Sequence, residues 1–366
     1  MVKGEGDGGD IRVLVIDDSP GTRGSIKAML AGAPGVRVVG QAADGDEGLR
    51  EALALEPDVI TLDLEMPRMD GYTFLRILMS KRPTPVVVVS SHSARESVFK
   101  ALELGAIDFV AKPARTVAPE LDTIRHELIA KIKGLGRLEP VRLRGARAAT
   151  AAGFAPGPRS PETVAPAPHL LGVVCIGAST GGPPALKEVF EMLPADLPVA
   201  VLVSQHMPAS FTGPFARRLD TAGGFRVREA AGGESLEPGV GLVAPGSGSM
   251  VIEARPGGSL GVRIESAEQT RPTPKIVPSI DRMMETAVAQ MGRNTMAVVL
   301  TGMGSDGSRG VAAVHRAGGV TAVEAESTAV IYGMPEAAVR TGAVDDIVPL
   351  DGVAEAIVRF ARSLPR

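Results

Sequence analysis

Short runs of apolar residues alternate with amphipathic stretches from Ile11 to about Lys133. The apolar runs contain little polar alternation, which is typical of parallel strands that are covered on both faces. The stretches between them, such as GTRGSIKAMLAG and GYTFLRILMS, have the spacing of helices that pack on a sheet. This pattern predicts a doubly wound α/β domain with a five-stranded parallel sheet. The strand candidates are IRVLVID, VRVVGQA, DVITLD, PVVVVSS and AIDFVAK.

A second alternating pattern begins after Leu170. GVVCIGA, VAVLVSQ, MAVVLTG and GVTAVEA have the composition of buried strands, and stretches such as PALKEVFEML indicate helices between them. The segment GVGLVAPGSGSMVIEARPGGSLGVRIE alternates with glycine turns, which favours hairpins. We therefore expect a second doubly wound α/β domain, with a mostly parallel sheet and an antiparallel hairpin insert.

The stretch between the two patterns is rich in Ala, Pro, Gly and Arg and offers almost nothing to bury, so we interpret it as a flexible linker. The basic cluster RLEPVRLRGAR near its start is either a patch for phosphate or an acidic partner, or a solvated part of the linker. The predicted organisation is a disordered N-terminus (1–10), a first domain (11–135), a linker (136–169) and a second domain (170–366).

Composition narrows the possible partners and compartments. Among the 366 residues 44% are hydrophobic and 22% are charged, and the formal net charge of -3 gives no overall basic field for nucleic acid. The longest apolar runs are far below the ~20 residues that span a bilayer, and no secretory signal is visible. The single cysteine, Cys175, lies in an apolar strand and is expected to be a buried structural thiol. We expect a cytoplasmic monomer without membrane insertion.

Polar residues end the strands of the first domain, at the sheet edge where function collects in doubly wound folds. Asp17 and Asp18 end the first strand, Asp63 the third, Ser90 the fourth and Lys112 the fifth. Clustered carboxylates repel one another and need a hard cation such as Mg²⁺. A single acidic residue at a strand end would be explained as a turn former. The whole set predicts a site where Asp63 is a nucleophile for a phosphoryl group that the metal and Lys112 neutralise.

These residues and the stretch DLEMPRMDG resemble the receiver domain of two-component response regulators, which has a flavodoxin-like fold. The resemblance covers all of the first domain. It implies that Asp63 is the phospho-acceptor. It also implies that Asp18, Asp63 and the backbone carbonyl of Glu65 bind Mg²⁺, with Asp17 in support.

The same resemblance assigns the residues that respond to phosphorylation. Ser90 is implied to hydrogen-bond the phosphoryl group, and Phe109 to occupy the aromatic switch position. The AKP motif is implied to place Lys112 on the phosphate, with a cis peptide bond before Pro113.

The stretch VVCIGASTGGPPAL, which begins at Val173, ends an apolar strand with glycines around Ser179. It fits a nucleophile turn of the G-x-S-x-G type or a glycine loop that binds phosphate. The phosphate loop is disfavoured because GASTGGPP lacks the lysine of a P-loop and the G-x-G-x-x-G spacing.

A serine nucleophile needs a base and a group that orients the base. Outside the first domain, His206 is the only histidine that follows a buried strand and precedes a turn, and Asp306 follows the strand MAVVL within TGMGSDGSRG. Taken singly, Ser179 and Asp306 are also plausible helix caps and His206 a packed histidine. Backbone N–H groups near Thr180 and Met303 are the expected oxyanion donors.

The motifs IGASTGG, QHMP, LTGMGSDG and YGMPEAA, behind a receiver and a linker, resemble the chemotaxis response regulators that are protein-glutamate methylesterases. The resemblance implies Ser179 as nucleophile, His206 as general base and Asp306 as the carboxylate that orients it. It implies hydrolysis of γ-glutamyl methyl esters on methyl-accepting chemotaxis receptors, with release of methanol, and in many members deamidation of receptor glutamines. Hydrolysis needs no cofactor, since Mg²⁺ belongs to the receiver.

A receiver in front of an esterase implies control by a histidine kinase of the chemotaxis type. We expect the unphosphorylated receiver to inhibit the catalytic domain until Asp63 is phosphorylated. Three alternatives remain open. The first is a related enzyme that acts on a receptor outside chemotaxis. The second is a non-catalytic, phospho-dependent signalling scaffold, and the third is an amidase that acts mainly on glutamines.

Two stretches depart from the family pattern. APGSGSM has Ser249 where members often have histidine. KIVPSID lacks a histidine and an arginine of the family pattern but keeps Pro278, Ser279 and Asp281. Neither departure touches the predicted triad, and we expect both to line the approach of the substrate.

Overall fold

A computed structural model describes residues 9–90, 95–112, 118–136, 169–270 and 276–365 of the chain. The chain divides into two compact units at residues 147 and 148, and each is described by itself. Nearly all of the predicted disordered N-terminus and the predicted linker lie outside the described residues, as does the expected cis peptide bond at Pro113.

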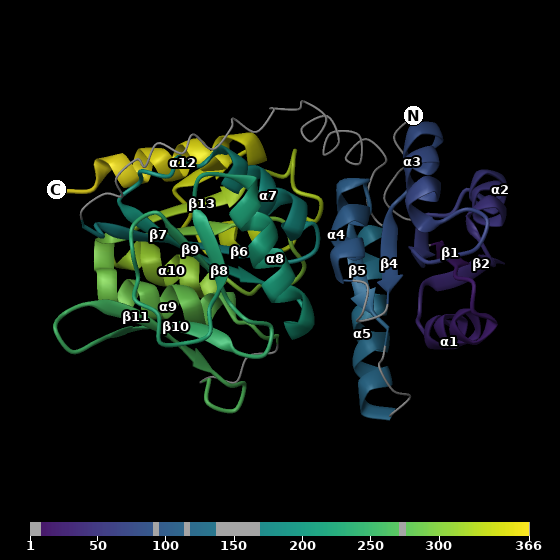
Figure 1. The fold of residues 1–366 in the computed structure, drawn as a ribbon, viewed down its shortest axis with the longest axis horizontal. Coiled ribbons are helices and arrows are strands. Elements are labelled where there is room, and N and C mark those ends of the chain that lie inside the picture. The colour runs from purple at the N-terminus through teal and green to yellow at the C-terminus, as the bar shows by residue number, and fades with distance from the viewer. Residues whose placement is uncertain (1–8, 91–94, 113–117, 137–168, 271–275, 366) are drawn as a thin grey trace. The chain divides into compact units, whose positions relative to one another are not determined.

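The N-terminal unit is a five-stranded sheet in the order β2-β1-β3-β4-β5, and every adjacent pair is parallel (Figure 1). The interior strands β3 and β4 are buried along their whole length, which explains why their sequences show no polar alternation. The predicted flavodoxin-like order is confirmed. The elements are β1 (Ile11–Ile16), α1 (Pro20–Ala31), β2 (Val36–Ala42), α2 (Gly45–Leu55), β3 (Val59–Leu62), α3 (Gly71–Lys81), β4 (Val86–Ser90), α4 (Arg95–Glu103), β5 (Asp108–Ala111) and α5 (Ala118–Leu135).

The C-terminal unit contains a seven-stranded sheet in the order β14-β13-β12-β6-β7-β9-β8 with only parallel pairs. Helices cover both faces: α7, α8 and α12 pack together on one, and α9 and α10 on the other (Figure 1). Helix α11 packs against α10. The strands are β6 (Gly172–Ala178), β7 (Val199–Gln205), β8 (Arg226–Glu229), β9 (Val240–Val243), β10 (Ser249–Ala254), β11 (Leu260–Glu265), β12 (Thr295–Val299), β13 (Val320–Glu324) and β14 (Asp346–Val348). The helices are α7 (Gly182–Met192), α8 (Ala209–Ala222), α9 (Ile280–Met291), the 3₁₀ helix η1 (Gly292–Asn294), α10 (Ser308–Arg316), α11 (Met334–Val339) and α12 (Leu350–Ser363).

The antiparallel insert is smaller than the sequence suggested. Only β10 and β11 form a hairpin, which packs against α9. The preceding strand β9, expected in a hairpin, instead joins the main sheet parallel to β7 and β8. All four residues of β9 are buried, so it needs the cover on both faces that an interior strand of this sheet receives.

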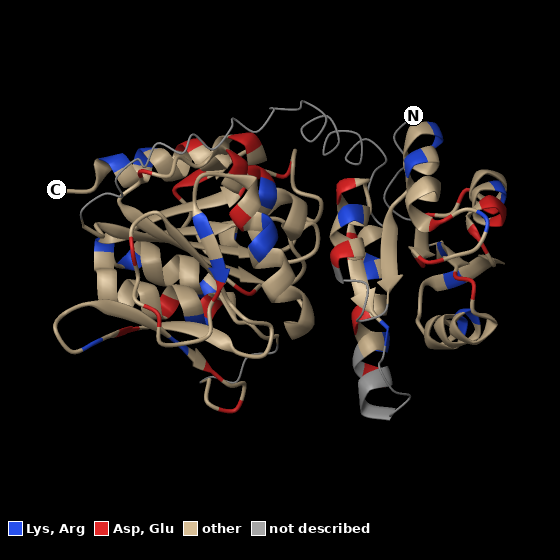
Figure 2. Cartoon of the chain, viewed as in Figure 1, with Lys and Arg blue, Asp and Glu red and all other residues tan. Residues whose placement is uncertain are grey.

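Charges of both signs are mixed over the elements of each unit. Figure 2 shows Lys and Arg beside Asp and Glu on the helices of both units, so this view shows no face of a single charge. Among the described residues no helix is long and apolar enough to cross a membrane. Cys175 is completely buried in β6, as the sequence predicted.

Strand order determines where each unit can place a site. In the N-terminal unit the chain reverses its direction of winding between β1 and β3, and in the C-terminal unit it does so around β6. Crevices at such switch points, outside the carboxyl ends of the strands, are the binding positions of doubly wound folds. The residues that follow β1, β3, β6, β7 and β12 therefore lie at the positions where such folds bind their ligands.

Candidate functional site

Three carboxylates gather at the carboxyl edge of the N-terminal sheet. Asp17 and Asp18 follow β1 and Asp63 follows β3, and one oxygen of each lies within 4.8 Å of the others. The Nζ atom of Lys112 lies 2.8 Å from Oδ2 of Asp17 and 2.6 Å from Oδ2 of Asp63. Closely spaced carboxylate oxygens suit Mg²⁺, so the donor set fits the metal that the sequence predicted.

The electrostatics of this cluster keep Lys112 charged. Burial alone would lower the pKa of Lys112, but its hydrogen bonds and charge interactions with Asp17 and Asp63 outweigh burial, so the pKa is raised. Burial is the largest effect on Asp17 and raises its pKa, although Lys112 opposes that shift. A fixed positive charge beside Asp63 is suited to neutralise an incoming phosphoryl group.

The other predicted receiver residues surround the cluster. Ser90 is buried at the end of β4, and its carbonyl accepts the Lys112 N–H at 2.7 Å. Phe109 is buried and packs edge-on against Phe99, with ring centroids 6.4 Å apart. Glu65, whose carbonyl is the predicted metal ligand, has an exposed side chain in the loop after β3. Their predicted roles stay predictions.

The predicted hydrolase residues follow three adjacent strands of the C-terminal sheet. Ser179 follows β6 and His206 follows β7, and the His206 N–H donates to the Ala178 carbonyl at 3.1 Å. On the other side of β6, the Ser179 N–H donates to the carbonyl of Thr301, after β12, at 3.0 Å. Asp306 lies in the same loop as Thr301, before α10. The three residues therefore lie at one sheet edge, as their positions in the sequence predicted.

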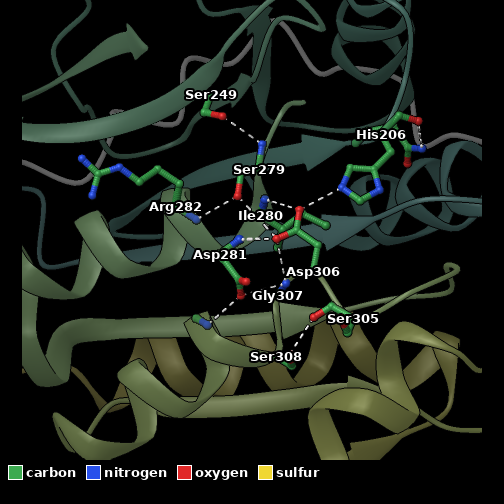
Figure 3. Close-up of polar contacts among 12 residues, drawn as sticks. His206, Ser249, Ser279, Ile280, Asp281, Arg282, Ser305, Asp306, Gly307 and Ser308 are labelled. Atoms are coloured by element: carbon green, nitrogen blue, oxygen red, sulfur yellow. Dashed lines mark hydrogen bonds and ion pairs between the residues drawn. The ribbon is translucent and has the colours of Figure 1, made fainter. Parts of the chain in front are cut away.

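His206 and Asp306 contact each other directly (Figure 3). Nε2 of His206 lies 3.0 Å from Oδ2 of Asp306, and both side chains are largely buried. Because a carboxylate accepts, this contact assigns the ring proton to Nε2. Nδ1 of His206 is buried and has no hydrogen-bond partner among the described residues. One basic nitrogen is thus available in the residue that adjoins the Ser179 loop.

The N-terminus of α9 holds the Asp306 carboxylate. The N–H groups of Ile280 and Asp281 donate to it at 2.8 Å and 2.9 Å, where the partial positive charge of a helix start favours an anion. Burial alone would raise the pKa of Asp306, but the hydrogen bond and charge of His206, with these two N–H groups, outweigh it, so the pKa is lowered. An ionised Asp306 can orient His206 and stabilise its protonated ring.

Asp281 makes the reverse arrangement: it lies at the start of α9, and its carboxylate accepts hydrogen bonds from the start of α10. Its Oδ1 accepts the N–H groups of Gly307 and Gly310, both at 2.9 Å. Its Oδ2 accepts from Nε of Arg309 at 2.9 Å. Asp306 therefore caps α9 while Asp281 caps α10, and we call these two residues the reciprocal caps (Figure 3). They fix the β12–α10 loop to the start of α9.

Ser249, expected to line the substrate approach, is instead fully buried at 0% exposure. Its hydroxyl accepts the N–H of Ser279 at 3.1 Å, and Ser279 is the N-cap of α9. The small side chain at this position thus supports the helix that holds Asp306. In the other altered stretch Lys275 lies outside the described residues, and Ile276 is exposed.

The predicted oxyanion donors lie in the loops after β6 and β12. Thr180 is buried, and its carbonyl accepts the Thr301 hydroxyl at 2.9 Å, whereas Met303 is half-buried. A Cβ atom at Gly302 would lie 2.8 Å from Cβ of Ser179. Only glycine therefore lets the two loops approach this closely. The assignment of the oxyanion donors stays a prediction.

Two buried polar side chains at the same edge were not predicted from the sequence. Gln205 is the last residue of β7, and Glu324 is the last residue of β13. The only signal in the sequence is that a polar residue closes an otherwise apolar run, which does not distinguish them from ordinary strand ends.

Glu324 supports the β12–α10 loop. Its Oε2 accepts the Thr301 N–H at 2.8 Å, and the side chain is 1% exposed. Burial raises the pKa of Glu324 to about 7, although hydrogen bonds from Thr301 and Thr328 oppose the shift and the charge of Glu188 adds to it. The Thr301 carbonyl in turn accepts the Ser179 N–H.

We expect Glu324→Gln to remove a pH-dependent loss of stability. The folded protein keeps this carboxyl protonated to about pH 7, whereas the unfolded chain releases the proton near its ordinary pKa of 4.5. The wild type therefore loses stability as pH rises from 4.5 through 7, by on the order of 3 kcal/mol, and the uncharged amide does not.

Urea unfolding of the full chain between pH 5 and pH 8 measures this difference. Glu326→Gln, an exposed position two residues on, is the control and should change with pH as the wild type does. Parallel pH curves for the wild type and Glu324→Gln would contradict the raised pKa.

The fold and the two sheet edges define a response regulator: a receiver with an acidic cluster, joined to an α/β domain with a serine, histidine and aspartate at one edge. The sequence comparisons identify the family. Residues 174–357 match the family described as CheB methylesterase, and residues 13–119 match the response regulator receiver domain. The chain belongs to the CheB methylesterase family, so the resemblance seen in its motifs is confirmed.

Named relatives match nearly the whole chain. Protein-glutamate methylesterase/protein-glutamine glutaminase 3 of Geobacter sulfurreducens is 48% identical over 363 residues, covering 95% of this chain and 97% of that protein. A second such protein, number 6 of Anaeromyxobacter dehalogenans, is 48% identical over 354 residues and covers 96% of each chain. The solved catalytic domain of Thermotoga maritima CheB methylesterase aligns with 51% of this chain and 97% of its own, at 33% identity and a TM-score of 0.49.

Proposed function

We propose that this protein hydrolyses glutamate γ-methyl esters on methyl-accepting chemotaxis receptors, under the control of phosphorylation at Asp63. The observation that carries the proposal is the His206–Asp306 hydrogen bond at 3.0 Å, at the sheet edge where Ser179 ends the adjacent strand. The names of the relatives support methyl esters of protein glutamates as the substrate, and the resemblance to chemotaxis response regulators supports receptors as the proteins that carry them.

In the proposed reaction Ser179 Oγ attacks the ester carbonyl carbon while Nδ1 of His206 takes the hydroxyl proton. Asp306 stabilises the resulting imidazolium, and the N–H groups near Thr180 and Met303 hold the oxyanion. The intermediate collapses with loss of methanol, to which His206 returns the proton. Water, activated by His206, then cleaves the acyl-enzyme to glutamate and regenerates Ser179. The same steps on a receptor glutamine release ammonia, so we include deamidation in the proposal.

The receiver supplies the control in this proposal. Asp63 accepts the phosphoryl group from a histidine kinase of the chemotaxis type, and Lys112 neutralises its charge. Asp17, Asp18, Asp63 and the Glu65 carbonyl would hold Mg²⁺, which supplies charge neutralisation at the phosphoryl group when bound. We also propose a cytoplasmic monomer with domain limits at 11–135 and 170–366, in which the unphosphorylated receiver inhibits the catalytic domain.

The test is release of labelled methanol from receptor membranes that carry methyl-labelled glutamates, by the full chain with and without a small phosphodonor. We expect release, increased by the phosphodonor. Membranes whose receptors carry alanine at the methyl-accepting positions are the control. No methanol, with glutamine converted to glutamate in the same receptors by mass spectrometry, would replace the esterase by the amidase. If neither product forms, the remaining alternatives are a non-catalytic scaffold and a related enzyme that acts on a receptor outside chemotaxis.

A further inference from the structure

One buried amide connects the loops of the proposed nucleophile and the proposed base. The side chain of Gln205 is 2% exposed. Its Nε2 donates to the Ser179 carbonyl at 2.9 Å and to the His206 carbonyl at 3.0 Å. An amide nitrogen carries two hydrogens, so both bonds can form at once. The two acceptors belong to the residues on which the proposed reaction depends.

The first of these bonds also fixes the direction of a neighbouring N–H group. The Ser179 carbonyl and the Thr180 N–H belong to one planar trans peptide, in which the two groups point in opposite directions. The same carbonyl accepts the Gly182 N–H at 2.8 Å, so two donors set the orientation of the peptide. Among the described residues, the Thr180 N–H has no hydrogen-bond acceptor. By anchoring the Ser179 carbonyl, Gln205 thus helps to fix the direction of the unpaired Thr180 N–H.

The other end of the amide gives a second, independent observation. Oε1 of Gln205 is buried without a hydrogen-bond partner among the described residues, which costs free energy. A Cβ atom at Gly182 would collide with this oxygen, so a glycine at the start of α7 makes room for it. The Gln205 side chain thus keeps the two hydrogen bonds of its Nε2 atom at the cost of leaving its Oε1 atom unpaired.

We propose that Gln205 is a positioning residue that aligns the Thr180 N–H for the oxyanion and holds the His206 loop against the Ser179 loop. Oxyanion donors act because they are oriented before charge develops, so an anchored peptide favours the transition state more than the bound substrate. This inference rests on the proposed function, because it needs Ser179 to be a nucleophile.

The test uses Gln205→Glu, which keeps the shape but replaces the donor by an acceptor facing two carbonyl oxygens, and Gln205→Met, which is apolar and of similar length. We expect kcat for methanol release to fall by about 10²–10³-fold in both, with KM within about twofold. The rate at which a fluorophosphonate reacts with Ser179 should fall in the same proportion, because that reaction also builds charge on an oxygen beside Thr180. Gln290→Glu, on the exposed side of α9, is the matched control.

Rates are normalised to the folded fraction from circular dichroism. If Gln205→Glu does not fold, the result for Gln205→Met alone is the test. A kcat within about fivefold of wild type, or a raised KM at unchanged kcat, would overturn the positioning role. If the wild type reacts with the fluorophosphonate but releases no methanol, the proposed substrate is wrong, and the probe rates alone decide the role of Gln205. If the wild type does neither, the nucleophile assignment fails and the role of Gln205 fails with it.

Discussion

Replacing Ser179 with alanine is expected to reduce methanol release by at least about 10⁴-fold, because the hydroxyl is the proposed nucleophile and removal of a triad nucleophile leaves only a residual rate. The fold should not change. Among the described residues, the hydrogen bonds of Ser179 use its backbone: the N–H donates to Thr301, and the carbonyl accepts from Gly182 and Gln205. The measurement is labelled methanol released by the full chain with the phosphodonor present.

Ser363→Ala is the control for this variant. Ser363 is an exposed residue of α12, and its hydroxyl bonds to the Phe360 carbonyl within the same helix. It should retain wild-type activity. More than about one per cent of wild-type release by Ser179→Ala, with a normal circular dichroism spectrum, would contradict the nucleophile assignment and direct attention to a different catalytic group.

Replacing Asp63 with asparagine is expected to abolish phosphoryl uptake from a small phosphodonor and, with it, all stimulation of methanol release. An amide nitrogen cannot accept the phosphoryl group as the carboxylate does, and the neutral side chain weakens the ion pair that Lys112 makes at 2.6 Å. Basal release should stay at the unstimulated level of the wild type. Intact-mass measurement of the full chain reports phosphoryl uptake directly.

Asp46→Asn provides the matched control, since Asp46 is an exposed residue of the first turn of α2. It should take up phosphoryl and respond to the phosphodonor. Uptake by Asp63→Asn at the wild-type level would show a different acceptor. A basal rate in Asp63→Asn equal to the fully stimulated wild type would instead contradict inhibition by the unphosphorylated receiver.

The groups of residues at the two sheet edges could be predicted from the sequence, because one rule relates a residue's position after a strand to its place in the fold. In a parallel sheet the residues that follow each strand meet at one edge. Asp17, Asp63 and Lys112 illustrate this in the receiver, and His206 and Asp306 in the second unit, where a separation of 100 residues ends in direct contact. No detail of packing was needed to predict these groupings.

The supporting side chains could not be predicted from the sequence, because their hydrogen-bond partners are backbone groups of distant loops. Gln205 bonds to the carbonyl of Ser179, and Glu324 bonds to the N–H of Thr301. Strand patterns indicate burial but not which backbone group a buried side chain will meet. Ser249 shows the same limit, since it was expected to line the approach of the substrate, whereas its hydroxyl accepts a hydrogen bond from the start of α9.

The reciprocal caps change what can be learned from other members of this family. Asp306 satisfies the first N–H groups of α9, and Asp281 satisfies those of α10, so loss of either would leave helix ends unpaired whether or not the enzyme is active. A relative that has lost its chemistry would still be expected to keep Asp306 in order to fold. The presence of Asp306 in a sequence therefore says little about activity. The Ser179 hydroxyl makes no hydrogen bond among the described residues, so a serine at that position is the more informative sign of activity.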